Sequence, residues 1–334
     1  MTSRQLARLI GVSQSAVSRA FTPNSSISPA LRERVLTSAR ELGYEPNAIA
    51  AMLSSRKTNI VGIVVSDVTN PFYPGLTGKL SQGLQRNGLQ SLLFNVTPGA
   101  NIEGQLAALK RYNIDAVIVI AATVLSEPTL AWVTEGRNAV LVNRLVSSDL
   151  MSVCCDNTHG ARTIIDHLHQ TGRRKIAYVA GLTGTGIALA RQHAAVTRMA
   201  ELGMQLAGSF SRGVYSYEAG YQAALEAAAE RPDAVMFAND ILALGGFDAL
   251  RDELGLDVPG DMAVTGFDDI DMASWPHYQL TTYRQPVEAI VEETLALITE
   301  GPRRKHRQIS LAGELVVRRS SQAAAGDRRD KGGA

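Results

Sequence analysis

The sequence has few of the features that mark disulfide-bonded, membrane-spanning or secreted proteins. Two cysteines occur among 334 residues, and they are adjacent, Cys154 and Cys155. Adjacent cysteines cannot link distant segments, two of them make no metal cluster, and their scarcity fits a reducing compartment. No apolar run approaches the length of a membrane span, and the polar N-terminus lacks an apolar signal core. These absences exclude secreted and membrane proteins and predict a cytoplasmic protein without a membrane partner.

Catalytic signatures are also missing. We find no nucleophile elbow, no phosphate-binding P-loop and no zinc-ligand spacing, and histidines and acidic residues do not gather on one loop. Gly184-Thr185-Gly186 follows a predicted strand, as a dinucleotide fingerprint would, but Leu189 stands where the third glycine belongs. A two-glycine match is weak. The sequence therefore predicts no enzyme, no cofactor and no metal site.

The net charge of +1 hides an uneven distribution. Residues 1–57 carry eight Lys and Arg against three acidic residues, whereas the rest of the chain is mildly acidic. We call residues 1–57 the head and the rest of the chain the body. A basic head on a mildly acidic body is suited to a head that contacts phosphate groups. By itself, however, the same distribution fits an ordinary solvated helix surface equally well.

The first residues have the pattern of a capped helix. Thr2 and Gln5 have the spacing of a capping box, in which side chain and backbone satisfy each other at a helix start. Leu6, Leu9 and Ile10 fall on one helical face and are expected to pack inward. A glycine follows at position 11, where a left-handed residue ends a helix at no steric cost.

A second helix is predicted at Gln14–Phe21, with Ser13 as its cap. Its apolar residues face inward, which leaves Gln14, Ser15, Ser18 and Arg19 outside. Two helices joined by a tight glycine-containing turn form a helix-turn-helix. Glutamine can pair with adenine in a bidentate manner and arginine can pair with guanine, so the outer face has the chemistry that reads a DNA groove.

A third helix follows Ser28-Pro29, and then a short apolar segment, Tyr44–Lys57, that is too short to be a stable isolated helix. At this point the chain resembles the LacI/GalR family of bacterial transcription regulators. The resemblance weakens after the head but continues to about residue 319. It is carried by a dense, ordered set of residues: Gly11-Val12-Ser13, Val17-Ser18-Arg19, Ile27-Ser28, Arg32-Glu33-Arg34-Val35, Leu42-Gly43-Tyr44, Pro46-Asn47-Ala48-Ile49-Ala50 and Leu53.

From residue 59 onward, apolar strands alternate with amphipathic helices. Alternation of this kind predicts an α/β fold with parallel sheets, and the chain is long enough for two of them. The predicted strands are Ile60–Val65, Gln90–Asn95, Ala116–Ala121, Ala139–Asn143, Lys175–Ala180, Ala234–Ala238, Met262–Gly266, Gln308–Leu311 and Glu314–Arg318.

The resemblance implies a particular domain order. An all-α helix-turn-helix domain (residues 1–44) precedes a hinge helix and linker (45–57) and a periplasmic-binding-protein-like effector and dimerisation domain (58–319). That body has an N-subdomain (about 58–156 plus 286–314) and a C-subdomain (about 157–284 plus 315–319), with three crossings near 156–160, 283–287 and 314–316. The tail, residues 320–334, is rich in Gly, Ala and charge and is predicted to be disordered.

Polar and aromatic residues follow the carboxyl ends of the predicted strands, where ligands of open α/β sheets bind. Such positions include Asn70, Phe72 and Tyr73 after the first strand and Phe267 and Asp268 after a late one. Carboxylate, amide and guanidinium groups beside aromatic rings suit a small hydroxylated ligand.

The resemblance selects many of the same positions and assigns them roles. For DNA contact it and the helix faces indicate Thr2, Ser13, Gln14, Ser15, Ser18, Arg19, Asn47, Ala50 and Leu53, with Leu53 as a wedge in the minor groove. For effector contact the set is Asn70, Phe72, Tyr73, Asn143, Cys155, Thr185, Arg191, Tyr215, Asn239, Asp268 and Gln285.

Simpler roles compete at several of these positions. Asp268, like Asp240, precedes a predicted helix and could be only an N-cap, and Arg191 could be only the partner of a neighbouring acid. Asn70 fits a plain turn. Tyr215 could be core packing, and Cys155 fits wall packing better than chemistry.

We therefore predict a transcription regulator, in particular a repressor, that binds a palindromic DNA operator as a homodimer. Its expected effector is a small sugar-like molecule. The tail lacks the apolar heptads that would build a higher oligomer, which favours the dimer. The alternative is a cytosolic small-molecule-binding or sugar-processing protein without operator binding, and a salt-dependent, sequence-specific DNA affinity would separate the two.

Overall fold

The structure is a computed structural model that divides the chain into two compact units, Met1–Thr58 and Asn59–Ala334. The residues that the structure describes are 1–22, 25–46, 58–66, 68–96, 109, 111–120, 131, 135, 138–144, 150–300 and 308–322. The predicted hinge helix therefore lies almost entirely outside the described residues.

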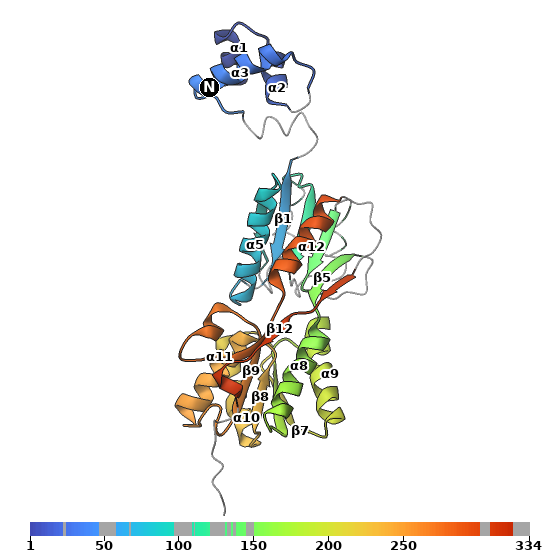
Figure 1. The fold of residues 1–334 in the computed structure, drawn as a ribbon, viewed down its shortest axis with the longest axis vertical. Coiled ribbons are helices and arrows are strands. Elements are labelled where there is room, and N and C mark those ends of the chain that lie inside the picture. The colour runs from blue at the N-terminus through green and yellow to red at the C-terminus, as the bar shows by residue number, and fades with distance from the viewer. Residues whose placement is uncertain are drawn as a thin grey trace, which may run out of the picture. The chain divides into compact units, whose positions relative to one another are not determined.

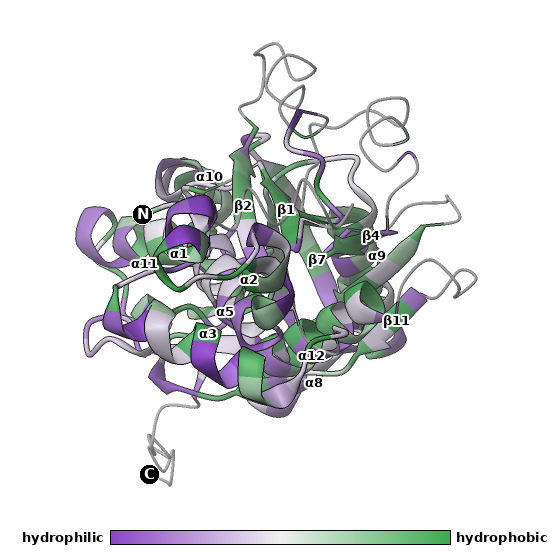
Figure 2. Ribbon diagram, turned by 90° about the horizontal axis from the view of Figure 1, so that it is seen from above, coloured by the Kyte–Doolittle hydropathy of each residue, from purple (hydrophilic) through white to green (hydrophobic). Residues whose placement is uncertain are grey.

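The head contains three helices, α1 (Ser3–Leu9), α2 (Gln14–Phe21) and α3 (Pro29–Glu41). The predicted caps form: both arms of the Thr2–Gln5 capping box are present, and the side chain of Ser13 accepts from the backbone of α2. Val17, Val35 and their neighbours close a small apolar core between the helices. In Figure 2, α3 carries alternating purple and green bands, as expected of a helix with one buried face.

The prediction that Leu9 packs inward is wrong. Leu9 is 67% exposed, whereas Ala7 is buried beside Leu6. The helix is only seven residues long, so its buried stripe is narrow, and the turn after it carries Ile10 but not Leu9 to the core.

The body begins with a six-stranded parallel sheet in the order β11-β5-β4-β3-β1-β2. Strands β1, β3, β4 and β5 are almost fully buried, which explains their near-continuous apolar sequences. Helices α5 (Phe72–Arg86) and α12 (Val287–Thr299) pack against each other on this sheet (Figure 1). The strands are β1 (Ile60–Val65), β2 (Gln90–Asn95), β3 (Ala116–Ile120), β4 (Asn138–Val142), β5 (Met151–Cys155) and β11 (Gln308–Leu311).

A second six-stranded sheet has the order β12-β10-β9-β8-β6-β7 and is parallel except for the β10–β12 pair. Its strands are β6 (Lys175–Ala180), β7 (Gln205–Ser211), β8 (Ala234–Phe237), β9 (Ala263–Asp268), β10 (Thr281–Arg284) and β12 (Glu314–Val316).

Two helix pairs lie on opposite sides of the second sheet (Figure 1). One pair is α8 (Asn157–Gln170) with α9 (Gly186–Glu201). The other is α10 (Tyr217–Ala229) with α11 (Asp240–Asp248), and α11 continues as one turn of π-helix, Ala249–Glu253. Short 3-10 turns complete the described elements at Asp271–Ser274 and Arg319–Ser321.

The sequence did not predict strands β5, β7 and β10. β7 is an edge strand that is mostly exposed and rich in polar residues, and β10 is four residues long with two threonines. Neither has an apolar run or a strict alternation, so only pairing with their neighbours defines them as strands.

Three connections join the first sheet to the second. β5 leads into α8 through Asp156, β10 leads into α12 through residues 285–286, and β11 leads into β12 through residues 312–313. The first and third connections are tied by a hydrogen bond from the Asp156 N–H to the Leu311 carbonyl oxygen, 2.7 Å. The third connection therefore lies slightly before the predicted 314–316.

The ordered body extends into the segment that we expected to be a disordered tail. Ser320 and Ser321 are buried against the second sheet, where the hydroxyl of Ser320 donates to the Val264 carbonyl oxygen at 2.7 Å. Ser321 lies 2.7 Å from both His167 Nε2 and Thr281 Oγ1. The prediction of disorder is thus wrong for these two residues, while residues 323–334 lie outside the described part.

Helices α10 and α11 approach each other closely through glycines. A Cβ on Gly245 would lie 1.9 Å from the Tyr217 carbonyl oxygen, and one on Gly220 would lie 2.0 Å from that of Leu242. Backbone atoms cannot move aside as a flexible side chain can, so both positions require glycine.

We expect Gly245→Ala to lower the free energy of unfolding by about 3 kcal/mol or more, because overpacking against backbone forces the helix pair apart. Gly75→Ala is the matched control, since a Cβ there meets nothing within 4 Å. Urea unfolding of the two variants measures the difference. Equal stability of Gly245→Ala and wild type would show that the helix pair is looser than described.

Candidate DNA-binding surface and effector site

The outer face of α2 is polar and exposed, as the sequence predicted. Gln14, Ser15, Ser18 and Arg19 are all exposed, while the opposite face is buried. The Arg19 Nε donates to the Ser15 carbonyl oxygen at 3.2 Å, one turn earlier on the same helix. The side chain therefore lies along the exposed face of α2.

The helix start is organised by hydroxyl groups. Ser13 caps α2, and its Oγ lies 2.9 Å from the Oγ of Ser15. Thr2 caps α1 in the same way and is exposed. Their DNA role stays a prediction, as do the roles of Asn47, Ala50 and Leu53, which lie outside the described residues.

In the body, Arg191 is the centre of a buried polar network. Its side chain is 4% exposed and lies with its guanidinium carbon 3.6 Å from the centroid of the Phe267 ring. Nε donates to Asn157 Oδ1 and a terminal nitrogen donates to the Ala238 carbonyl oxygen, each at 2.7 Å. A buried guanidinium is tolerated only with such partners, because it cannot lose its charge.

Asp268 completes the network from the end of β9. Its Oδ1 lies 3.6 Å from a terminal nitrogen of Arg191 and accepts from Gln285 Nε2 at 2.6 Å. Burial raises the pKa of Asp268 to about 6, although Arg191 and Gln285 act in the opposite direction. Asp268 therefore joins Arg191 and Gln285, which come from two other segments, instead of serving only as a helix cap.

A second buried carboxylate, Asp240, lies beside this network. It accepts from Thr282 Oγ1 at 2.6 Å and from the Ile270 N–H at 3.0 Å. Burial and the nearby Asp268 raise the pKa of Asp240 to about 7. The N-cap of α11 is its neighbour Asn239, so the capping role considered for Asp240 is wrong.

Cys155 and Tyr215 lie near enough to Arg191 and Asp268 for the two charges to affect their pKa values. Burial raises the pKa of Cys155 to about 12, with Arg191 acting against this, so the thiol stays protonated. Burial also raises the pKa of Tyr215. The Tyr215 ring lies so close to Gly181 that a Cβ added to this glycine would be 2.2 Å from the ring. The ring thus packs on the loop after β6, and Cys155 brings β5 of the first sheet to the same place.

A separate group gathers at the carboxyl ends of β1 and β4. Asn143 Nδ2 donates to the Tyr73 hydroxyl at 3.4 Å, and the Tyr73 and Phe72 rings meet edge to face at 5.5 Å. Asn70 Oδ1 accepts from the Phe72 N–H at 3.2 Å, which is the turn role considered for it. Asn143 has a φ of 54°, a strained conformation that asparagine adopts more readily than most residues.

Thr185 and Asn239 lie at the helix starts that follow β6 and β8. The Thr185 side chain accepts from the Ala188 N–H at 3.2 Å, and that of Asn239 accepts from the Leu242 N–H at 3.2 Å. Both are N-caps in this structure. Asn239 directly follows Ala238, whose carbonyl oxygen accepts from Arg191.

Sequence reasoning missed Asn157, the residue that holds Arg191 Nε and also donates to the Cys155 carbonyl oxygen at 2.8 Å. Asn157 is the first residue of α8 after the first connection, and nothing in its local sequence links it to a residue 34 positions away. Only the structure shows that Asn157 is buried at a helix start.

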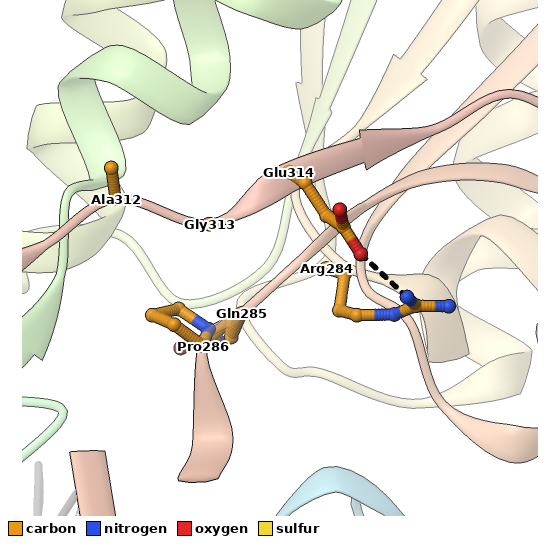
Figure 3. A pocket seen from close by; sticks show the side chains of 6 residues that line it. All are labelled: Arg284, Gln285, Pro286, Ala312, Gly313 and Glu314. Atoms are coloured by element: carbon orange, nitrogen blue, oxygen red, sulfur yellow. Dashed lines mark hydrogen bonds and ion pairs between the residues drawn. The ribbon is translucent and has the colours of Figure 1, made fainter. Parts of the chain in front are cut away.

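A pocket of about 290 Å³ opens where the second and third connections run side by side (Figure 3). Arg284 and Glu314 line it and pair with each other at 2.5 Å, and Arg284 also pairs with Asp269 at 2.6 Å. Gln285 lines the pocket and also contacts Asp268, so the connections and the buried network share a residue.

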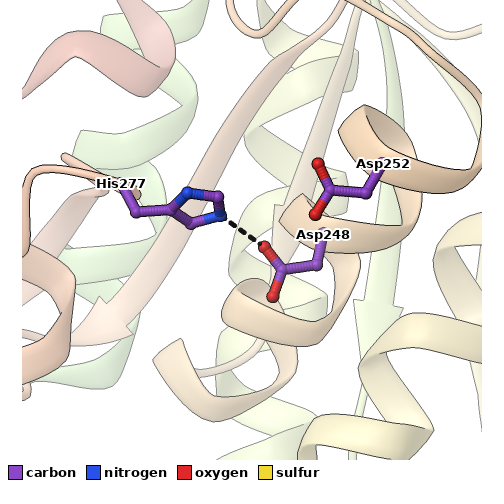
Figure 4. Close-up of side chains that lie close together, drawn as sticks. All are labelled: Asp248, Asp252 and His277. Atoms are coloured by element: carbon purple, nitrogen blue, oxygen red, sulfur yellow. Dashed lines mark hydrogen bonds and ion pairs between the residues drawn. The ribbon is translucent and has the colours of Figure 1, made fainter.

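Within the described residues, Asp248, Asp252 and His277 could together face a cation, since their ligand atoms lie within 4.8 Å of one another (Figure 4). Asp248 is already engaged, because it accepts from the hydroxyls of Tyr217 and Tyr278 at 2.7 and 2.9 Å and lies 2.9 Å from His277 Nε2. We interpret the cluster as a surface hydrogen-bond network.

None of the described helices has the length and apolar character to cross a membrane. A helix-turn-helix head and a body of two largely parallel sheets joined by three connections define a class, the one-chain transcription regulators with a periplasmic-binding-protein-like body. Two family models match these parts, bacterial regulatory proteins of the lacI family over residues 4–47 and the periplasmic binding protein-like domain over residues 165–321.

The chain belongs to the LacI family of bacterial transcription regulators, which are not enzymes. The regulator CelR of Thermobifida fusca is 30% identical over 96% of this chain and 98% of its own. Catabolite control protein A of Priestia megaterium is 29% identical over 90% of this chain and 92% of its own.

Solved structures agree with the fold. A Lac repressor dimer bound to operator and the anti-inducer ONPF has a TM-score of 0.84, covers 97% of this chain and 99% of its own, and is 24% identical. A complex of transcriptional regulator CelR with cellobiose has a TM-score of 0.71 and 29% identity over 96% of this chain and 99% of its own.

Proposed function

We propose that this protein is a cytoplasmic repressor that binds a palindromic operator as a homodimer and responds to a sugar-like effector. The observation that carries the DNA-binding part is the exposed face of α2, where Gln14, Ser15, Ser18 and Arg19 stand together above a buried core. A short capped helix with this outer chemistry is the element that enters a major groove.

Base reading is tested by Arg19→Ala. We expect a loss of about 1–3 kcal/mol on the preferred site and relaxed selectivity at one base pair, because a bidentate arginine–guanine contact is worth that amount. Binding to the selected and to random duplexes at several salt concentrations measures it. An equal loss on both duplexes would make Arg19 a phosphate contact instead.

The predicted hinge offers an independent test. By family resemblance, residues 47–55 form a helix on DNA, and Leu53 enters the minor groove and opens a base step. Leu53→Ala should weaken operator binding at least tenfold and reduce DNA bending while effector affinity stays unchanged. Gel-shift and bending assays with the full chain would contradict the wedge if the variant bent and bound the operator normally.

For the effector, the supporting observation is the buried network of Arg191, Asp268 and Gln285 at the carboxyl ends of the second sheet. Guanidinium, carboxylate and amide groups can exchange their mutual contacts for the hydroxyls of a ligand, and the nearby Tyr215 ring offers a stacking face. The relative CelR is known in complex with cellobiose, which makes neutral saccharides the first ligands to test.

The effector is proposed to act by changing how the two subdomains close. Three connections join the sheets, and Gln285 on the second of them contacts the network directly. A ligand shifts such an equilibrium only by its differential affinity for the two states, and the coupling between effector and operator is reciprocal. Effector affinity must therefore differ with and without operator.

The deciding experiment selects duplexes from a random pool with the full chain, and then measures the affinity and stoichiometry for the selected site. A thermal-shift screen of mono- and disaccharides follows, since a bound ligand raises apparent stability by mass action. A chain that binds saccharides but selects no DNA sequence would support the alternative of a binding protein without an operator.

A further inference from the structure

The first helix of the head holds the side chain that begins the second. Arg4 Nε donates to Gln14 Oε1 at 3.1 Å, and Gln14 Nε2 donates to Ser3 Oγ at 3.2 Å. Ser3 and Arg4 are the first two residues of α1, and Gln14 is the first residue of α2. The tight turn between the helices brings the two starts together, so the Gln14 amide is held at both of its ends.

The chemistry of this contact is directional. A glutamine amide has an oxygen that only accepts and a nitrogen that only donates, and rotation about its last bond exchanges their places. Arginine can only donate, so it selects the amide oxygen, whereas a serine hydroxyl can either donate or accept. Arg4 therefore determines which end of the Gln14 amide carries the acceptor.

That direction matters for base recognition. Adenine offers a donor and an acceptor in a fixed order in the major groove, and a bidentate glutamine must match that order. Each amide end has a second hydrogen-bonding position, so contacts with Ser3 and Arg4 leave one acceptor and one donor position of Gln14 for a base.

We propose that Arg4 is a positioning residue for base recognition, and that it presets the orientation of the Gln14 amide from the first helix. Selectivity at the base pair that Gln14 contacts thus depends on a residue outside the second helix. This inference depends on the proposed DNA-binding function. Holding a flexible side chain before binding saves part of the ordering cost of the complex, which corresponds to a three- to tenfold effect on affinity.

The test uses the full chain and a duplex selected from a random pool by the wild-type protein. Each base pair of this duplex is replaced in turn, and Gln14→Ala identifies the base pair whose discrimination Gln14 provides. Arg4→Ala should then reduce discrimination at that same base pair about three- to tenfold. In the double variant, Arg4→Ala should add nothing to the loss of discrimination caused by Gln14→Ala.

Two further variants separate positioning from charge. Arg4→Lys keeps a group that can only donate and should retain most of the discrimination, whereas Arg4→Gln can also accept and should not. Arg8→Ala removes an exposed positive charge from the same helix and should weaken binding to all duplexes alike. Thermal unfolding of each variant checks that the head is folded.

Uniform weakening by Arg4→Ala, with the discrimination ratio unchanged at the Gln14 position, would overturn the inference and make Arg4 a phosphate contact. A Gln14→Ala variant that keeps discrimination at every base pair would overturn it as well. A wild-type chain that selects no sequence would instead overturn the proposed DNA-binding function, and with it any role of Arg4 in recognition.

Discussion

Asp268→Ala should abolish the response to effector while operator binding stays within about threefold of wild type. The carboxylate is buried and touches both Arg191 and Gln285, so its removal leaves a buried guanidinium without its counter-charge. Removing one partner of a buried, hydrogen-bonded charge pair at a binding site costs about 2–5 kcal/mol, or roughly thirty- to several-thousandfold in effector affinity.

The measurement is isothermal titration with the saccharide that gives the largest thermal shift, together with operator binding in its presence and absence. Asp268→Asn tests the charge at nearly constant shape and should have an effect in the same direction. Asp271→Ala is the control, because Asp271 is an exposed acid three residues further along the chain. Wild-type effector affinity in Asp268→Ala would remove this network from the effector site.

The second expected result is a loss of folded-state stability as the pH rises from about 4 to about 7. Burial raises the pKa of Asp240 from 3.8 to about 7 and that of Asp268 to about 6. In this window the folded chain holds protons that the unfolded chain has released, so the free energy of unfolding falls with rising pH. A shift of one pKa unit corresponds to about 1.4 kcal/mol, so the two sites together should account for a loss of several kcal/mol.

Urea unfolding at intervals of half a pH unit measures how the free energy of unfolding depends on pH. Asp240→Asn cannot ionise, so the difference between wild type and this variant should grow as the pH rises through the window and then level off above pH 7. Asp271→Asn, at the exposed site, should leave the curve unchanged. Parallel curves for wild type and Asp240→Asn would show that the Asp240 carboxyl ionises as easily in the folded as in the unfolded chain.

The pH result also bears on the effector site. The Asp240 carboxyl accepts from Thr282, which lies on β10 just before the second connection, and Asp240 itself begins α11 next to Asn239. Ionisation of Asp240 therefore changes the charge beside Asp268, the carboxylate that lies next to Arg191. We expect effector affinity to vary with pH over the same window, and to vary less in Asp240→Asn.

Local signals in the sequence were reliable where a single segment contained all the necessary information. The Thr2–Gln5 capping box and the Ser13 cap form as predicted, because their partners are three residues apart. Buried parallel strands such as β1 and β3 could be predicted from their continuous apolar runs. Leu9 and the edge strand β7 were misjudged or missed for the opposite reason, since their surroundings depend on packing.

The candidate site shows the same division. Strand-end positions pointed to Arg191 and Asp268, but their partners Asn157, Ala238 and Gln285 come from other elements, 17 to 47 residues away. Hydrophobic periodicity says which face of an element is buried and nothing about which distant element covers it. The distances, the burial of Asp240 and its raised pKa follow only from how the chain crosses between the sheets.

By itself the sequence determined the helix-turn-helix, the α/β class of the body and the family, because caps, apolar periods and motif spacing are properties of neighbouring residues. Only the tertiary structure decided that Ser320 and Ser321 are buried against the second sheet, that Asp268 contacts Arg191 and Gln285, and that Arg4 holds Gln14. Hydrogen bonds and burial between distant residues require the three connections and the interhelical turn to place them, and no local pattern contains that geometry.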